Sequence, residues 1–434
     1  MTYIRGTIFK GKVIISSSGN TPSVYWQANY AEMIDTSATS QVRDSTGNIY
    51  LTVDDQNNFD SYILKYDTTG TLVWQFMISG VAGIGGLIID ASDNLYININ
   101  INSGGTVDSS VIKLTSNCNI VWQTKIVSGN SYVYVAKMTL DSSGNIYFCG
   151  TEQAGLGIGF IVKLDSTGSV LWQSEIGGSY PNLSQINTLE VDTTGNSYAI
   201  GTAPRVGDFN SSDMCIIKYN ASGSVISQLS YPVAVGSCQP FSSQIDSSNN
   251  LYISGYTGTT AFLIKLNSSG SIIWQVALDG VLSEISSTIL LDGSGNIYMA
   301  GFKNISSVQT GFIIKFNSSG TIVWQRDIGT TLSGSISTAV SKITVNGSDM
   351  YISVSMYDNT TSISYNSLIR LPNDGSLTGT YGNLVYSTGY SGIGSITVTP
   401  VGLSATISAG NISLSTLNYT LSVSSLTSIT TSIP

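Results

Sequence analysis

The sequence predicts an all-β fold, a seven-bladed β-propeller, from three observations. A phrase of the form GTIVWQ recurs about every fifty residues. With its near-copies it holds all six tryptophans, Trp26, Trp74, Trp122, Trp172, Trp274 and Trp324. A second phrase, of the form DSSGNIY, alternates with the first. Charged residues make up only 10% of the chain and glycines number 45, a balance typical of proteins rich in strands and turns.

Each of these phrases predicts one β-hairpin. It joins two short apolar runs through a polar stretch with Gly or Asn where a positive φ is required. The repeat that starts at Ser287 therefore contains four expected strands, STILLD, NIYMAG, GFIIKF and TIVWQRD. Such a unit cannot bury both of its own faces, so neighbouring units must stack, and closure of the ring protects the sheet edges.

The number of blades follows from the number of hairpins. The DSSGNIY phrase and its relatives, with a degenerate copy that ends at Tyr351, predict seven blades. The segment SVYWQANY, residues 23–30, precedes every first strand, so we expect it to close the ring as the outer strand of the last blade. Eight blades are the alternative if residues 392–408 form another first hairpin, because GIGSITV resembles GIGGLII from Gly83.

The predicted organisation has three parts: residues 1–30 with the ring-closing strand, residues 31–374 with the propeller repeats, and residues 375–434 as a tail rich in Ser and Thr. The tail has no Asp, Glu, Lys or Arg, yet its residues alternate as strands do. Uncharged strands with free edges tend to associate. We therefore expect the tail to pair with the propeller or with other copies, and to serve as an assembly element.

Side chains that recur in every repeat are predicted to be scaffold. Each Trp is expected to cover an adjacent sheet, with a sugar platform as the alternative. One repeat position holds a cation, which is expected to pair with a carboxylate such as Asp141 or Asp292 or to lie over a ring, with an anion-binding ring as the alternative. These cations are Lys65, Lys113, Lys163, Lys218, Lys265, Lys315 and Arg370. The DSSGN segments resemble half a calcium loop but lack the Glu at its twelfth position, so they are predicted to be turns, with no metal site.

Composition excludes several function classes. A net charge of −9 and a pI near 4.4 argue against nucleic acid as a partner. The four cysteines form no CxxC pair and are predicted to be buried free thiols: Cys118, Cys149, Cys215 and Cys238. With no histidine in the chain, Ser-His-Asp, Cys-His and His-metal chemistry are excluded. P-loop and dinucleotide phrases are absent, so we predict no cofactor and no enzyme, with a paired-carboxylate glycosidase as the alternative.

A binding surface is predicted on one face of the ring. The turns within hairpins are short and uniform, whereas the other connections vary, as in TAPRVGDFNSSD from Thr202 and MYDNTTSISYN from Met356. Variable loops on a rigid scaffold usually carry binding. The expected contacts are Tyr132, Tyr180, Arg205, Phe209, Tyr231 and Tyr357, and plugs at the blade junctions are the alternative role for these aromatics.

Two resemblances bear on the origin of the chain. The phrases DSSGNIYFCG from Asp141 and GFIIKFNSSGTIVWQ from Gly311 resemble the bacterial and phage propeller repeat known as SBBP, over roughly residues 20–380. The junction IRLPNDGSLTGTYGNLVYS from Ile369 resembles the ends of structural proteins of tailed marine phages such as cyanophages. The N-terminus shows no signal peptide, and no apolar run reaches the length that spans a bilayer.

The second resemblance implies a virion protein, made in the host cytoplasm without a signal and later facing the outside. We therefore expect a non-enzymatic virion component, tail- or fibre-associated, whose propeller displays or adheres. Its expected partners are other virion proteins or copies of itself through residues 375–434, and host surface glycans or proteins. The alternatives are a secreted or surface carbohydrate-binding propeller of a bacterium, which is extracellular, and a carbohydrate-active enzyme.

Overall fold

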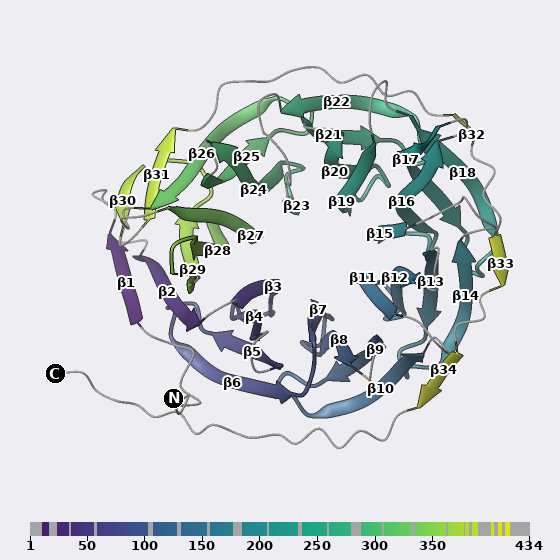
Figure 1. Cartoon of the computed structure of the whole chain (residues 1–434), viewed down its shortest axis with the longest axis horizontal. Coiled ribbons are helices and arrows are strands. Elements are labelled where there is room, and N and C mark those ends of the chain that lie inside the picture. Colours follow the sequence, from purple (N-terminus) through teal and green to yellow (C-terminus); the bar gives the residue numbers. More distant parts are fainter. Residues whose placement is uncertain are drawn as a thin grey trace.

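The computed structural model is a ring of seven antiparallel sheets, and its described residues contain no helix (Figure 1). It describes residues 11–16, 24–33, 36–55, 59–102, 107–127, 132–153, 157–176, 185–205, 208–232, 237–257, 260–278, 288–305, 308–330, 335–361, 363–376, 378–381, 384–388, 401–402, 407–409 and 413–416. The predicted seven-bladed propeller is confirmed, and the described residues form seven sheets; most of residues 392–408, the alternative extra hairpin, lie outside the described residues. Among these residues no helix is long and apolar enough to cross a membrane.

The first four blades each consist of four consecutive strands. Blade 1 has β3 (Thr36–Arg43), β4 (Ile49–Asp55), β5 (Asp60–Tyr66) and β6 (Leu72–Ser79). Blade 2 has β7 (Gly83–Ile89), β8 (Leu95–Asn102), β9 (Val107–Leu114) and β10 (Ile120–Val127). Blade 3 has β11 (Tyr132–Leu140), β12 (Ile146–Gln153), β13 (Ile158–Leu164) and β14 (Val170–Ile176). Blade 4 has β15 (Gln185–Val191), β16 (Ser197–Arg205), β17 (Asp208–Tyr219) and β18 (Val225–Tyr231).

The remaining three blades complete the ring. Blade 5 has β19 (Cys238–Ile245), β20 (Leu251–Thr257), β21 (Thr260–Leu266) and β22 (Ile272–Leu278). Blade 6 has β23 (Thr288–Leu291), β24 (Ile297–Ile305), β25 (Val308–Phe316) and β26 (Ile322–Thr330). Blade 7 has β27 (Ile336–Asn346), β28 (Asp349–Asp358), β29 (Ile363–Pro372) and, from the other end of the chain, β2 (Val24–Met33). In every blade the first strand lies nearest the axis and the fourth lies at the perimeter (Figure 1).

The ring closes between blade 7 and blade 1. The strand β2 is antiparallel to β29, with Trp26 opposite Arg370 and Ala28 opposite Leu368, which is the pairing that the sequence predicts for this segment. On the inner side of the seam, Gln41 of β3 donates from Nε2 to Thr344 Oγ1 at 2.6 Å and accepts from Ser353 Oγ at 2.7 Å. The two ends of the propeller are therefore joined by a shared sheet and by side-chain hydrogen bonds.

The hydrophobic core lies between blades. One cluster joins Tyr252 and Leu263 of blade 5 to Met299 and Phe312 of blade 6, and other clusters join other neighbours in the same way. Each blade thus buries its two faces against its neighbours, as expected for a unit that cannot form a core alone.

Four tryptophans link the outer strand of one blade to the next blade. Trp122 of blade 2 donates from Nε1 to Ser166 O of blade 3 at 3.0 Å. A Cβ on Gly168 in that turn would lie 2.8 Å from the indole, and Gly168 has a φ of 86°. Trp172 and Trp274 make the same kind of bond to the turns of blades 4 and 6, and Trp324 donates to Asn373 O, just after β29 of blade 7. The expected packing of Trp on the adjacent blade is confirmed for these four.

Short strands add to the outer edges of several blades. The strand β31 (Leu384–Thr388) pairs with β26, and β30 (Gly379–Tyr381) pairs with β31. Farther along the tail, β32 (Val401–Gly402), β33 (Ile407–Ala409) and β34 (Ser413–Thr416) pair with β18, β14 and β10. At the other terminus β1 (Gly11–Ser16) pairs with β2. The described strands of the tail therefore pair with the chain's own propeller, one of the two arrangements that the sequence left open.

Candidate functional site

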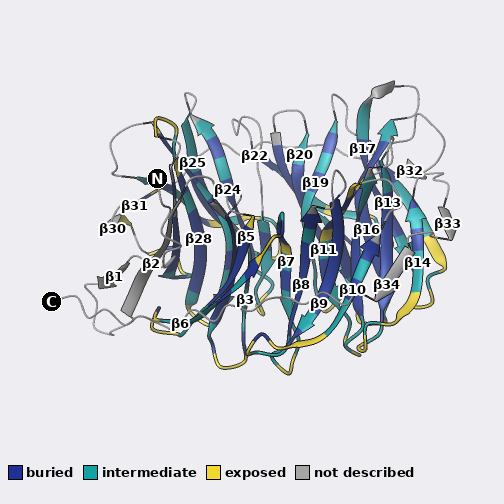
Figure 2. Ribbon diagram, turned by 60° about the horizontal axis from the view of Figure 1, so that its bottom comes forward, coloured by how far each residue is buried: buried dark blue, intermediate teal, exposed yellow. Residues whose placement is uncertain are grey.

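The two faces of the ring differ in their polar groups. The turns within hairpins lie on one face of the ring, and Figure 2 shows exposed turns gathered on this face, at the bottom of the view. In one of them Asp141 Oδ1 accepts from Ser143 N at 2.9 Å and from Asn145 N at 3.0 Å, while Oδ2 accepts from Asn145 Nδ2 at 2.8 Å. The repeated Asp thus satisfies the backbone of its own turn, as predicted for a structural role.

The repeated lysines complete these turns. Lys163 lies 3.7 Å from Asp141 and 4.8 Å above the ring of Tyr147, so it takes both of the predicted partners at once. In blade 1, burial alone would raise the pKa of Asp44, but hydrogen bonds from Asn48, Thr46 and Lys65 outweigh burial and lower it to about 2. The Asp44 carboxylate is therefore held ionised by scaffold contacts on this face.

The opposite face carries exposed aromatic side chains, as predicted. Tyr132 and Tyr357 are 41% and 39% exposed. Tyr132 lies nearly parallel to Tyr134 of the same strand, with ring centroids 6.5 Å apart and an angle of 6° between the planes. The sequence YVYV explains the arrangement, because alternate residues of a strand point to opposite sides, and Val133 and Val135 fill the core. The two tyrosines are thus held on the strand that lies nearest the axis in blade 3.

The other predicted contacts differ in their surroundings. Arg205 is partly buried and binds Asp213 through Nη2 and Nε, each 2.8 Å from Oδ1, so its charge is already neutralised. Phe209 lies in β17, but its side chain is outside the described residues, as is Tyr180. The structure does not place these residues together with Tyr132 and Tyr357 in one described patch.

The prediction for Tyr231 needs a correction. Its side chain is fully buried, and its hydroxyl donates to Gly270 O at 2.7 Å. Blade 4 has Ser227 where other blades have Trp. A Cβ on Gly270 would meet Leu229 at 2.2 Å and the Tyr231 hydroxyl at 2.8 Å, so these two residues fill the space of the missing indole. Tyr231 therefore replaces a tryptophan as a link between blades and does not form a binding surface.

Sequence reasoning missed two exposed aromatics on the variable face. Tyr134 is 41% exposed, and the YVYV alternation could have found it together with Tyr132. Phe59 is 53% exposed with a φ of 54°. Its carbonyl accepts hydrogen bonds from Gly80 N at 2.8 Å and Val81 N at 3.0 Å. The available sequence signal was an aromatic residue within the polar segment NNFD.

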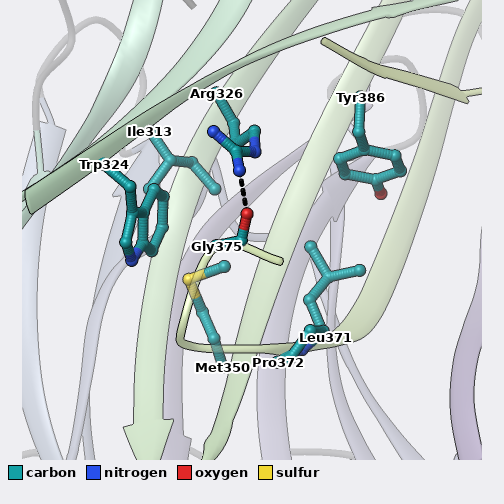
Figure 3. A pocket seen from close by; sticks show the side chains of 8 residues that line it. All are labelled: Ile313, Trp324, Arg326, Met350, Leu371, Pro372, Gly375 and Tyr386. Carbon is teal, nitrogen blue, oxygen red and sulfur yellow. Dashed lines mark hydrogen bonds between the residues drawn. The ribbon is translucent and has the colours of Figure 1, made fainter. Parts of the chain in front are cut away.

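A small apolar hollow lies between blades 6 and 7, lined by Ile313, Trp324, Arg326, Met350, Leu371, Pro372, Gly375 and Tyr386 (Figure 3). Arg326 lies over the Trp324 ring at 6.0 Å and donates to Gly375 O, the bond drawn in Figure 3. It also donates to Gln325 O at 2.6 Å. Since the cation is held by backbone carbonyls, we interpret the hollow as part of the joint between these blades.

The described residues contain no group of three His, Cys, Asp or Glu side chains placed to hold a metal ion. All four cysteines are free and buried, as predicted. Burial raises the pKa of both Cys149 and Cys215 to about 12, so these thiols stay protonated near neutral pH and are poor nucleophiles.

Comparison with known proteins gives no sequence match and only remote structural similarity. No family model matches the chain, and no curated protein sequence is similar to it. Among solved structures, a protein from Lactobacillus plantarum has a TM-score of 0.47 and 12% identity, covering 72% of this chain and 93% of its own. The polysaccharide lyase Uly1 has a TM-score of 0.46 and 11% identity, covering 84% and 99%. The AfRom2 CNH domain has a TM-score of 0.43 and 9% identity, covering 80% and 98%. At such identities and TM-scores, no function is transferred from these structures to this chain.

Proposed function

We propose that this protein is a non-enzymatic structural component of a virion, associated with the tail or a fibre, and that its propeller is a rigid adhesion module for a host surface. The observation that carries the adhesive role is the exposed, parallel pair Tyr132 and Tyr134 on the variable face. Tyrosine offers a large, rigid contact area with a polar tip, which suits it to interfaces. The opposite face consists of turns whose carboxylates are used by the scaffold.

The rigidity of the scaffold supports this proposal. Adhesion needs contact residues whose positions are fixed before binding, because ordering them afterwards costs affinity. Tyr132 and Tyr134 alternate with the buried Val133 and Val135 on β11, which pairs with β12 along its length. A propeller that faces outward from a particle would present such a pair without rearrangement.

Substitution of both Tyr132 and Tyr134 by Ala should weaken adhesion of the purified protein to host cells at least about tenfold, a loss of roughly 1.4 kcal/mol. Fluorescently labelled protein on whole cells gives the measurement. The control is Val323→Ser, which changes a side chain that is 54% exposed on an outer strand. Equal binding by the tyrosine variant and the parent, or an equal loss in the control, would refute the proposed surface.

The virion role rests on the resemblance of the repeats and of the segment after Ile369 to phage proteins, and the tail is its proposed means of attachment. Leu384 and Tyr386 lie in the core between blades 6 and 7, so a truncation that tests attachment should begin after Thr388. We propose that residues 389–434 connect the propeller to other virion proteins or to copies of itself. Pairing of β32, β33 and β34 with outer strands is then the resting state of a strand-donating segment.

Mass spectrometry of purified particles should detect the protein, and removal of residues 389–434 should abolish its incorporation while the truncated propeller keeps its melting temperature. Light scattering of both forms would report self-association. Absence of the full-length protein from particles would refute the virion role. Equal incorporation of both forms would refute the role of the tail.

A second candidate is an extracellular carbohydrate-binding propeller of a bacterium, which the same tyrosine pair favours, since flat aromatic faces also suit sugars. A glycan array separates the two candidates when it is combined with particle analysis. Binding to glycans by a protein that is absent from particles would support the second candidate.

A further inference from the structure

At one register position the seven inner strands carry small residues and two lysines. In the second strand of each blade, we count two residues on from the repeated Tyr. We then take the residue of the first strand that pairs with that position. These seven residues, which we name the lysine layer, are Ser40, Gly86, Lys137, Thr188, Ser242, Thr288 and Lys342. A register shift precedes this position in every blade except blade 6.

Lys137 lies on β11, the strand of blade 3 nearest the axis. Its Nζ donates to Ser243 O of blade 5 at 2.9 Å, two blades from its own strand. It also forms an ion pair with Glu190 of blade 4. Glu190 Oε1 in turn accepts from Ser243 Oγ at 2.9 Å, and Ser243 Oγ is 2.7 Å from Thr188 Oγ1. The charge of Lys137 is thus shared among three blades at the level of the layer.

Lys342 comes from the other side of the ring, as the positions of β11 and β27 in Figure 1 show. It lies opposite Ser353, and both Ser353 and Thr344 bind Gln41, so its neighbours toward blade 1 are neutral. Among the described residues no carboxylate lies within ion-pair distance of Lys342. Burial, and after it the charge of Lys137, lowers the pKa of Lys342. The charge of Lys137 therefore disfavours the protonated form of Lys342.

The charge of the inner strands is opposite to that of the whole protein. The chain has a net charge of −9. The described first strands contain the cations Arg43, Lys137 and Lys342 and the single anion Glu190. Arg43 lies near the turn at Gly47, away from the layer. At the layer itself there are thus two lysines, and Glu190 of blade 4 pairs with one of them, Lys137.

We propose that the axis of the propeller binds a small oxyanion, of the phosphate or sulfate type, at the lysine layer, with Lys342 as its main cationic partner and Lys137 as the second. A partly dehydrated ammonium group without a counterion gains from an anion, because charge-assisted hydrogen bonds are strongest where water is partly excluded. The bound ion links blades 3 and 7 across the ring, so it stabilises the closed propeller.

Trace acetylation of the intact protein at constant ionic strength tests this directly, with each lysine followed by mass spectrometry. At a phosphate concentration about ten times the dissociation constant, acetylation of Lys342 should slow about tenfold. Lys218, which lies over Tyr198 and donates to Ser268 O at 3.1 Å, should be unaffected. Separate titrations with sulfate identify the preferred ion. Equal labelling of Lys342 with and without either ion, or equal protection of Lys218, overturns the proposal.

A matched pair of variants gives a second readout. Phosphate should raise the melting temperature of the parent and of Lys218→Met in a saturable way, and the rise should be absent in Lys342→Met. Lys342→Arg should keep at least part of the rise because it keeps the charge. An equal rise in Lys342→Met and the parent overturns the proposal. If Lys342→Met does not fold, the labelling of the parent protein decides.

Discussion

Removal of residues 1–33 is expected to open the ring and to abolish the folded monomer, whereas removal of residues 1–16 leaves it intact. The first change deletes β2, which pairs with β29 from Trp26 to Met33. The second deletes only β1, which pairs with β2 as an added strand at the rim. The two truncations differ by one strand, so the comparison isolates ring closure.

The physical reason is the edge that the larger truncation exposes. Without β2, the backbone of β29 has a row of unpaired N–H and C=O groups, and such an edge pairs readily with other chains. Closure also holds blade 7 against blade 1, where Gln41 binds Thr344 and Ser353. Its loss should cost a large part of the roughly 5–15 kcal/mol that stabilises a typical protein. Circular dichroism and size-exclusion chromatography give the measurement, and equal melting temperatures of the two truncations would contradict the closure.

The repeat explains why the fold could be predicted. Hairpin turns, apolar alternation and the Trp phrase all recur with one period, so seven copies support the same strand assignment. The closing strand followed from one local fact, that residues 23–30 contain the outer-strand phrase without an inner strand before it. The partners of the lysines followed from the same logic, since one repeated cation faces one repeated carboxylate and one repeated Tyr.

The site was less predictable because its residues depend on departures from the repeat. Whether Tyr231 is buried depends on which residues fill the space of the absent indole. The sequence does not show that Leu229 and Tyr231 turn toward Gly270. Similarly, no pattern shows that Tyr386 adds to blade 6 and reaches the core. The lysine layer required the register of seven separate strand pairs, and Lys137 and Lys342 are two such departures in blades far apart in sequence.

Trp324→Ala should lower the free energy of unfolding by about 3–5 kcal/mol, the usual cost of removing a buried Trp side chain. Trp324 is the most buried of the described indoles at 9% exposure. It lies in the cluster that joins blades 6 and 7. Its Nε1 donates to Asn373 O at 3.1 Å, and a Cβ on Gly375 would lie 2.5 Å from the ring. The backbone of blade 7 therefore packs directly against the indole. Removal of the indole leaves a cavity beside the existing hollow.

Trp324→Phe is the matched control for this prediction, because it keeps an aromatic ring against Gly375 and removes the Nε1 donor to Asn373 O. The phenylalanine variant should lose less than half of what the alanine variant loses, since ring burial contributes more than one hydrogen bond of about 1 kcal/mol. Denaturant unfolding followed by tryptophan fluorescence and circular dichroism measures both. If Trp324→Ala unfolds at the same midpoint as the parent, the tryptophans do not hold the blades together, and the recurrence of Trp in six of the repeats would need an explanation at the surface instead of at the blade junctions.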